Sequence, residues 1–391
     1  MQIPLRLGLL GPDGSDLALD ASGATEQVLQ LRGAEQQFCF DGVDAEPVPS
    51  LNRGFSAPVK LRQALGHRDR AFLMAHDSDP FNRWEAGQQY AGDVLLALVA
   101  DLADARESEV DEAFVAAIGG LLRDPELDKA FVALACTLPG EGVLAEQMDK
   151  ADPGAIHQAR ELMRLAIADR LKDDLLAAYR ANQSNEPFHA DAASAGRRAV
   201  KNMALSYLVR LDDPAMTALA AEQYAGADNM TDRMAALWAL NDRATAERAE
   251  ALDAFHTRYH EDPVVIDKWL TVQAMSSLPE TLDHVRRLME HPTFALTQPN
   301  KVRALIGAFC AGNPARFHAS DGAGYRFLAE QVLALDAINP QVAARLATPL
   351  GRWRRYDDAR QALMRAELQR ILDAGSLSPD VYEIASKSLA G

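Results

Sequence analysis

Two histidines in the segment HTRYHEDPVVIDKW (residues 256–269) have a spacing that could bind a metal ion. His256 and His260 stand four residues apart, so on a helix both imidazoles lie on one face, as in the zinc-hydrolase motif His-Glu-x-x-His. The general-base position of that motif is occupied by Thr257. A second frame, starting at His260, lacks the second histidine and contains Pro263 where the helix would have to continue. The sequence therefore predicts a surface or structural role for both histidines.

No complete catalytic or cofactor-binding pattern occurs elsewhere in the chain. A zinc hydrolase needs two imidazoles, a third protein ligand and a carboxylate base, and the 9 histidines complete no such set. The nucleophile pattern G-x-S-x-G and the glycine-rich phosphate loops are also missing. Cys136 lies on an apolar helical face, where a buried and unreactive thiol is expected. The sequence predicts no catalytic residue and no metal ligand in this chain.

The overall charge limits the partners that the chain can have. It has 391 residues with a net charge of -16, because Asp and Glu outnumber Lys and Arg 56 to 40. Attraction to nucleic acid or to an anionic membrane is therefore disfavoured. The one locally basic run, RWRRYDDARQ at residues 352–361, is interpreted as a solvated face or as charge pairing between helices.

The cysteines and the apolar runs bear on location. The cysteines are odd in number, widely separated and without C-x-x-C spacing, which indicates reduced thiols. No run of about 18 apolar residues occurs, as a membrane-spanning helix would require. The N-terminal segment lacks the basic region of a signal peptide. The sequence thus predicts a cytoplasmic protein with neither a membrane nor a nucleic acid as partner.

Strand patterns dominate residues 1–66. Apolar residues alternate with Pro4, Arg6 and Gly8 near the start, which is typical of a half-buried strand. Further short strands are predicted at residues 27–31, 36–42 and 56–62. These segments favour a small antiparallel β-sandwich, marginally stable alone because a domain of this size buries a modest fraction of its surface.

Helical patterns fill residues 67–391, which are predicted to form a second domain. A capping residue followed by proline recurs, and this pair starts helices because proline at the first helical position loses no hydrogen bond. The pairs are Asp79-Pro80, Asp124-Pro125, Asp152-Pro153, Asp213-Pro214, Asp262-Pro263, Asn339-Pro340 and Ser378-Pro379. Their irregular spacing favours a mainly α fold, an irregular ARM/HEAT-like superhelix of antiparallel helix pairs.

Several segments resemble the C-terminal half of bacterial aminopeptidase N (alanyl aminopeptidase) family zinc metallo-aminopeptidases. The strongest are PVPSLNRGFSAPVKL (residues 47–61) and DPFNRWEAGQ (residues 79–88), which look like the join between that family's small β domain and its helical domain. Weaker matches follow in family order at residues 197–208, 227–237, 262–269, 300–309, 313–330 and 339–357. The resemblance covers almost the whole chain.

The resemblance implies that zinc and the catalytic residues lie elsewhere. Members of this family carry G-x-M-E-N and H-E-x-x-H in a thermolysin-like domain, and neither motif occurs here. The chain is therefore expected to begin after the catalytic domain, to hold no cofactor and to be inactive alone, so that its status as an enzyme is uncertain. Its partners would be the catalytic and N-terminal domains of the same aminopeptidase, together with peptide substrates.

In relatives the helical domain caps the catalytic cleft, restricts substrate access and scaffolds the catalytic domain. By similarity, Arg303, Gln341 and Arg345 match positions that face the resulting cavity, where guanidinium groups suit a peptide backbone or a C-terminal carboxylate. The alternative for Arg345 is an ion pair with a carboxylate between helices. The alternative function is a stand-alone helical-repeat module that binds peptide or protein without catalysis.

Overall fold

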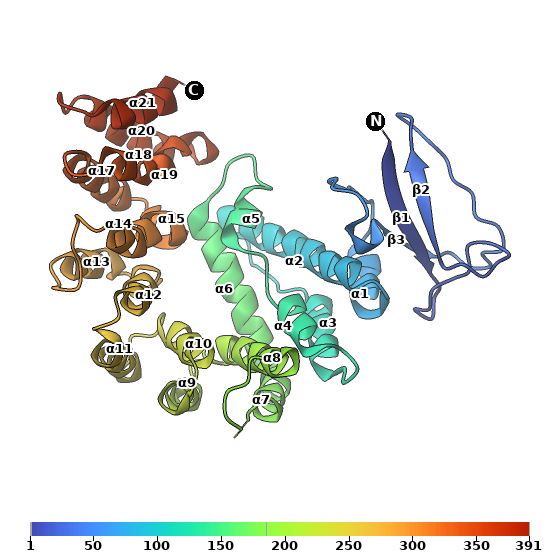
Figure 1. Cartoon of the computed structure of the whole chain (residues 1–391). Coiled ribbons are helices and arrows are strands. Elements are labelled where there is room, and N and C mark those ends of the chain that lie inside the picture. Colours follow the sequence, from blue (N-terminus) through green and yellow to red (C-terminus); the bar gives the residue numbers. More distant parts are fainter. Residues whose placement is uncertain (1, 185, 391) are drawn as a thin grey trace. The chain divides into compact units, whose positions relative to one another are not determined.

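The computed structural model describes residues 2–184 and 186–390 (Figure 1). The chain forms two compact units, here called the first and the second unit. The first comprises Met1–Pro139 and Met163–Ala204, and the second comprises Gly140–Leu162 and Leu205–Gly391. The division falls inside two long helices, α6 (Pro153–Arg170) and α8 (Ala192–Leu208). The domain boundary predicted after residue 66 lies where strand patterns give way to helical patterns, and it differs from the boundary between these two units. That domain boundary stays a prediction.

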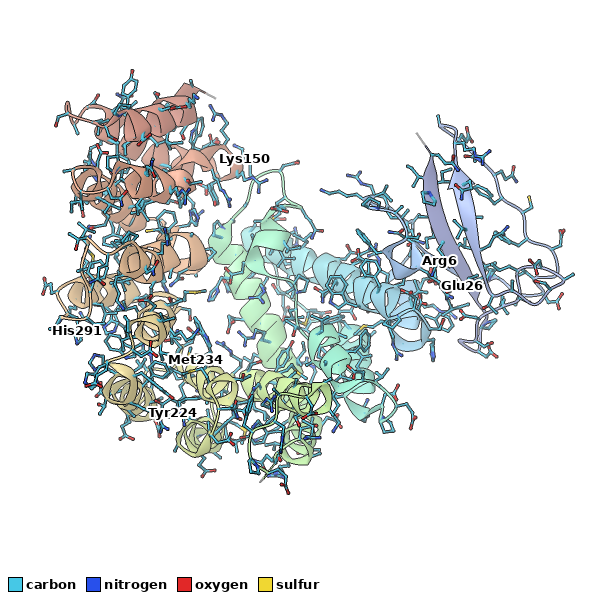
Figure 2. All side chains as sticks on the ribbon, viewed as in Figure 1. Arg6, Glu26, Lys150, Tyr224, Met234 and His291 are labelled. Atoms are coloured by element: carbon cyan, nitrogen blue, oxygen red, sulfur yellow. The ribbon has the colours of Figure 1, made fainter. Side chains whose placement is uncertain are left out.

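The first unit starts with a three-stranded antiparallel sheet in the order β2-β1-β3 (Figure 1). The strands are β1 (Ile3–Leu10), β2 (Glu26–Leu31) and β3 (Val48–Leu51). Alternation places Leu5, Leu7 and Leu9 in one apolar cluster with Leu29 of β2. The predicted first two strands are confirmed, and β1 is the central strand. Arg6 and Glu26 lie beside each other on β1 and β2, with 3.9 Å between their charged groups (Figure 2).

The other two predicted strands are wrong, and β3 was not predicted. Residues 36–42 and 56–62 form no ladder with another strand. Pro58 in the second of these segments has no N–H to donate to a ladder. The strand β3 pairs with β1, where Leu51 lies opposite Leu7. A short strand that is stabilised by a partner distant in the chain shows little strand pattern in its own sequence, so β3 could not be predicted.

The α-helices begin at His67 and continue to the end of the described chain. The first unit also contains η1 (Arg53–Phe55), α1 (His67–His76), α2 (Pro80–Ala103), α3 (Glu112–Arg123), α4 (Lys129–Ala135) and α7 (Lys172–Ala181). The second unit contains α5 (Glu141–Ala145), α9 (Pro214–Gly226), α10 (Met230–Leu240), α11 (Ala246–Tyr259), α12 (Pro263–Ala274), α13 (Thr281–Met289), α14 (Pro299–Val302), η2 (Arg303–Gly307), α15 (Ala308–Gly312), α16 (Pro314–Phe317), α17 (Ala323–Asp336), α18 (Pro340–Leu346), α19 (Thr348–Gly351), η3 (Trp353–Arg355), α20 (Asp358–Leu372) and α21 (Pro379–Ala390).

Successive helices of the second unit pack on one another in chain order, from α9 to α21 (Figure 1). Contacting pairs include α9 with α10, α11 with α12, α17 with α18, and α20 with α21. The predicted fold class, a mainly α and irregular array of helix pairs preceded by a small antiparallel β domain, is confirmed. Among the described residues, no helix is both long enough and apolar enough to cross a membrane.

Six of the seven predicted cap-proline starts are helix starts in the structure. Asp262 is representative, because its carboxylate accepts hydrogen bonds from the backbone N–H groups of Val264 and Val265. The exception is Asp124-Pro125, which follows α3 as a turn, while α4 starts later with Asp128 as its cap. A capping residue before proline also suits a turn, so this pair alone does not decide between the two.

A π-helical turn interrupts the helix that runs from α14 to α15. The turn η2 spans Arg303–Gly307, between Val302 and Ala308, and the backbone of all these residues stays right-handed helical. Such turns place one extra residue in a helix and often occur at functional sites. Here the turn begins at one of the residues that the sequence singled out.

Candidate functional site

A cavity of about 460 Å³ lies within the second unit. Its wall comes from α5, the start of α6, the helix that contains η2, and the segment from α18 to η3. Four arginines line it, namely Arg303, Arg345, Arg352 and Arg355, and we call it the arginine-lined cavity. A backbone hydrogen bond connects two parts of the wall, since the N–H of Ala151 donates to the carbonyl oxygen of Arg355 at 2.7 Å.

The structure brings two of the three predicted site residues to this cavity. Arg303 is the first residue of η2, and its guanidinium donates to the Asn300 side chain at 3.0 Å. Arg345 lines the cavity from α18. Gln341 lies one helical turn earlier, is exposed, and is not among the lining residues. The substrate-binding role of all three stays a prediction.

Arg345 has no carboxylate within ion-pair distance among the described residues. Its side chain is exposed on the cavity wall, and α18 buries Ala343, Ala344 and Leu346 instead. The alternative of an ion pair between helices therefore finds no partner in this part of the chain. An exposed guanidinium without an internal partner keeps all its hydrogen-bond donors for a ligand.

Sequence reasoning missed Arg352 and Arg355, which it assigned to a solvated face or to charge pairing. Charge pairing does occur in this run, at Arg360, whose guanidinium bonds to Asp357 at 2.5 Å and lies 3.4 Å from Asp152. Of the other three arginines in the run, Arg352 and Arg355 line the cavity. Their spacing of three residues puts them on one side of a 3-10 turn, which was the only signal in the sequence.

Two carboxylates, Glu141 and Glu146, also line the cavity, and one of them is already paired. Glu141 is largely buried and lies 2.8 Å from Nδ1 of His157 and 3.7 Å from the guanidinium of Arg160. With four arginines against two glutamates, the lining is positive although the whole chain is strongly acidic. Such a local excess of positive charge attracts anions.

Two titratable side chains of the cavity lining, His318 and Cys310, are held neutral. Burial, helped by the charge of Arg360, lowers the pKa of His318 to about 3. Nδ1 of this histidine lies 2.9 Å from the Tyr325 hydroxyl, and its ring packs on Tyr356. Burial also raises the pKa of the Cys310 thiol well above its usual range. The lining therefore supplies cationic donors and apolar surface, not a nucleophile with its base.

His256 and His260 lie at a corner between α11 and α12, which agrees with the predicted surface or structural role. His256 is near the end of α11, and Nε2 of its ring lies 3.2 Å from the Thr293 hydroxyl. The same ring packs against Trp269 and His291, the latter labelled in Figure 2. No group of three or more His, Cys, Asp or Glu side chains in the described residues could hold a metal ion. The prediction of a buried Cys136 is confirmed, and burial raises the pKa of its thiol to about 12.

The sequence matches two families in succession. Residues 67–390 match the family described as a domain of unknown function (DUF3458_C) with ARM repeats, and residues 1–64 match the DUF3458 domain of unknown function with an Ig-like fold. The chain belongs to the DUF3458_C family. Its helical and β parts are thus the two successive parts that these families describe.

Relatives named aminopeptidase N cover this chain from end to end. The protein from Caulobacter vibrioides is 42% identical over 384 residues, which are 98% of this chain and 43% of that protein. The protein from Escherichia coli is 37% identical over 391 residues, 100% of this chain and 45% of that protein. The chain therefore spans less than half the length of these relatives. The predicted resemblance to a C-terminal half of the aminopeptidase N family is confirmed.

A solved structure supports the same assignment. The crystal structure of Legionella pneumophila aminopeptidase A in complex with aspartic acid matches with a TM-score of 0.86 and 31% identity. The match covers 100% of this chain and 45% of that protein. The fold of this half is thus shared with a larger aminopeptidase.

Proposed function

We propose that this chain acts as the substrate-receiving half of an aminopeptidase that removes N-terminal amino acids from peptides. The helical part caps the catalytic cleft, restricts access to it and scaffolds the catalytic domain. The observation that supports this role is the arginine-lined cavity, an anion-attracting recess in a chain related throughout to proteins named aminopeptidase N. A cytoplasmic location is part of the proposal, and it is compatible with the three cysteines, none of which forms a disulfide among the described residues.

The cavity suits the downstream part of a peptide. Guanidinium groups bind a carboxylate through two parallel hydrogen bonds, and Arg303 and Arg345 both line the cavity. The apolar parts of the wall, such as Val302, Ile156 and Leu346, suit side chains of the same peptide. Gln341 remains a proposed contact for a longer peptide, at the margin of the cavity.

Zinc chemistry is not assigned to this chain. The family uses a zinc ion with two imidazoles and a carboxylate, and the described residues offer no matching ligand set. We therefore assign no step of hydrolysis to residues of this half. The chain with added zinc is expected not to cleave an alanyl chromogenic substrate, and turnover by the purified chain would contradict this assignment.

A pair of peptides tests the cavity directly. Trialanine should bind the chain at least tenfold more tightly than trialanine amide, because a charge-assisted hydrogen bond contributes about 1.5–3 kcal/mol. Calorimetry measures both affinities. Arg345→Met should remove the difference, while Arg62→Met, at an exposed arginine of the first unit, should leave it unchanged. Equal affinity for the acid and the amide would contradict carboxylate recognition.

The alternative, a stand-alone binding module, is favoured by one observation. Every residue that lines the cavity belongs to the second unit, so ligand binding requires no other domain. The DNA upstream of the coding sequence separates the two functions. An in-frame H-E-x-x-H region would support the aminopeptidase half, and a genuine start signal would support the module.

A further inference from the structure

A second cavity, of about 510 Å³, lies between α9, α10 and α11 in the second unit, and we call it the α9–α11 pocket. It shares no lining residue with the arginine-lined cavity. Tyr224 of α9, labelled in Figure 2, is one of its lining residues. A volume of this size is typical of small-molecule sites, so the nature of the wall decides what the pocket can hold.

The charged residues of the α9–α11 pocket are separated along α11. Glu247 and Glu250 lie near the start of this helix and Arg258 lies near its end, and all three line the pocket. The eight residues from Glu250 to Arg258 correspond to about 12 Å along the helix axis. The pocket therefore has an acidic end and a basic end.

Arg233 adds a second cation at the basic end. It lies in the first turn of α10, and its guanidinium donates to the hydroxyl of Tyr259, the last residue of α11, at 2.8 Å and to the carbonyl oxygen of Ala227. The Arg233 side chain is buried, with 5% of the residue exposed, yet no carboxylate of the described chain lies within ion-pair distance of it. A buried charge is costly without an opposite charge, so this end of the pocket favours an anion.

Tyr224 supplies a hydrogen-bond donor at the same end. The residue is only 8% exposed, and its hydroxyl has no hydrogen-bond partner among the residues that the structure describes. Burial raises the pKa of Tyr224 to about 12, although the charges of Arg233 and Arg258 act to lower it. The hydroxyl thus keeps its proton at neutral pH and can donate it to an anion beside the two guanidinium groups.

The acidic end lacks its opposite charge in the same way. Neither Glu247 nor Glu250 has a cation within ion-pair distance in the described part of the chain, and Glu250 is exposed. Arg258 likewise has no carboxylate partner there, and its guanidinium lies 5.7 Å from the ring centre of Tyr259. Both ends therefore have charges that a ligand can pair.

The wall between the two ends is apolar and made of small residues. Ala221 and Ala225 come from α9, and Ala251 and Ala254 come from α11. Small side chains leave room for a narrow aliphatic chain and offer it no polar partner. The pocket thus suits a ligand with opposite charges at its ends and methylene groups between them.

Length distinguishes the ligands that carry both charges. An extended lysine places its carboxylate carbon and its side-chain nitrogen about 7 Å apart. Hydrogen bonds of about 3 Å at both ends bring this reach close to the distance between Glu250 and Arg258. The ammonium and carboxylate groups of alanine sit on one carbon, so alanine reaches only one end.

We propose that the α9–α11 pocket binds a free basic amino acid, of which lysine is the simplest case. The carboxylate lies between Arg233 and Arg258 and accepts a hydrogen bond from Tyr224. The side-chain ammonium group pairs with Glu247 and Glu250, and the methylene groups lie against the alanines. This site is independent of the proposed function, because no residue of the arginine-lined cavity contributes to it.

A ligand-observed NMR titration of the full chain tests the proposal. Lysine should bind saturably and at least tenfold more tightly than norleucine, which lacks the side-chain ammonium group, or cadaverine, which lacks the carboxylate. Each comparison removes one charge-assisted interaction and keeps the aliphatic chain. Equal affinity for lysine and norleucine would overturn the proposal, and so would the absence of saturable lysine binding.

Variants at exposed positions assign the site without disturbing the fold. Arg258→Met and Glu250→Gln should each weaken lysine binding at least fivefold at an unchanged melting temperature. Arg62→Met and Glu261→Gln, which change exposed charges outside the pocket, are the matched controls and should bind lysine normally. Normal lysine binding by both pocket variants would overturn the proposal.

Two further variants separate this pocket from other sites. Glu250→Lys should reverse the preference between lysine and 2-aminoadipate, which carries a carboxylate in place of the side-chain ammonium group. Tyr224→Phe removes only the hydroxyl and should weaken lysine binding about threefold. Lysine binding that is lost in Arg345→Met but kept in Arg258→Met would place the amino acid in the arginine-lined cavity and would overturn the proposal.

Discussion

Arginine serves opposite purposes in the two units of this molecule. In the first unit, Arg53 is buried and its guanidinium is surrounded by Asp16, Glu26 and Asp77. In the second unit, Arg345 is exposed on a cavity wall without an internal carboxylate partner among the described residues. The difference teaches that the number of partners, more than the residue type, separates a structural arginine from one that is free to bind a ligand.

The largest expected effect comes from removing the buried arginine. Arg53→Met leaves Asp77, itself fully buried, without its cation, and the loss should be about 3–5 kcal/mol of unfolding free energy. Urea unfolding followed by circular dichroism measures this loss. A change smaller than about 1 kcal/mol would mean that the carboxylates find other partners, and the comparison would fail.

A smaller effect should come from crowding the same guanidinium. A Cβ atom added at Gly8 would lie 2.3 Å from the guanidinium carbon (Cζ) of Arg53. Because that side chain is held by carboxylates, it cannot move aside cheaply, and Gly8→Ala should cost about 1–3 kcal/mol of unfolding free energy. The double variant with Arg53→Met should cost less than the sum of the single changes. Additive losses in a double-mutant cycle would show that the clash is not with Arg53.

Acid should affect the two units in different pH ranges. His318 has a lowered folded pKa of about 3, so the unfolded chain takes up its proton first, and stability falls as pH decreases from about 6.5 to 3, by at most about 1.4 kcal/mol per pH unit. Burial acts to raise the pKa of Asp16, but hydrogen bonds from Arg53 and Ser78 outweigh it and lower the pKa. The stability that this lowered pKa contributes is fully present above the ordinary pKa of a carboxyl group. It is lost only as the pH falls below that value.

Hydrogen exchange at pH 7 and pH 5 measures this difference. Amides of α17 and α20 in the second unit should exchange faster at pH 5, after correction for the intrinsic rate, while those of β1 should not. His318→Gln should remove most of the change in the second unit. A uniform change across both units would show that this histidine does not control acid stability.

The smallest effect on stability should come from the cavity arginine. Arg345→Met should change the unfolding free energy by no more than about 0.5 kcal/mol, since the side chain is exposed and unpaired among the described residues. Thermal unfolding measures the loss of unfolding free energy in Arg345→Met, which is then compared with the loss in Arg53→Met. A loss similar to that of the buried arginine would give Arg345 a structural role and end the contrast between the two units.

Local chemistry in the sequence predicted the helices well and the sheet only in part. A cap such as Asp262 acts on amides two and three residues away, so its effect is visible in a short stretch of sequence. The strand β3 depends on β1, which is about forty residues distant, and its four residues give no alternation of their own. The false strand at residues 36–42 shows the same limit, because an apolar pattern without a partner strand makes no ladder.

The candidate site was predictable only where family resemblance pointed to it. Arg303 and Arg345 came from similarity, whereas Arg352 and Arg355 were interpreted, with the rest of their basic run, as a solvated face or as charge pairing between helices, and the structure shows such pairing at Arg360. The cavity joins α5, η2 and η3, which are far apart in the chain, and no local pattern contains that information. Arg53 shows the converse, since nothing in its neighbours along the chain marks it as buried.

The π-helical turn η2 has a consequence for how such a cavity can arise. A π turn accommodates one residue more than an α-helix does, so a single insertion creates it without moving the packed residues on either side. Removing one residue between Arg303 and Gly307 should therefore restore a regular α-helix with both flanks in place, so that only residues of the turn itself, Arg303 among them, change the direction of their side chains. A one-codon change in gene length is thus enough to give or withdraw a ligand-facing arginine in a fold that is otherwise unchanged.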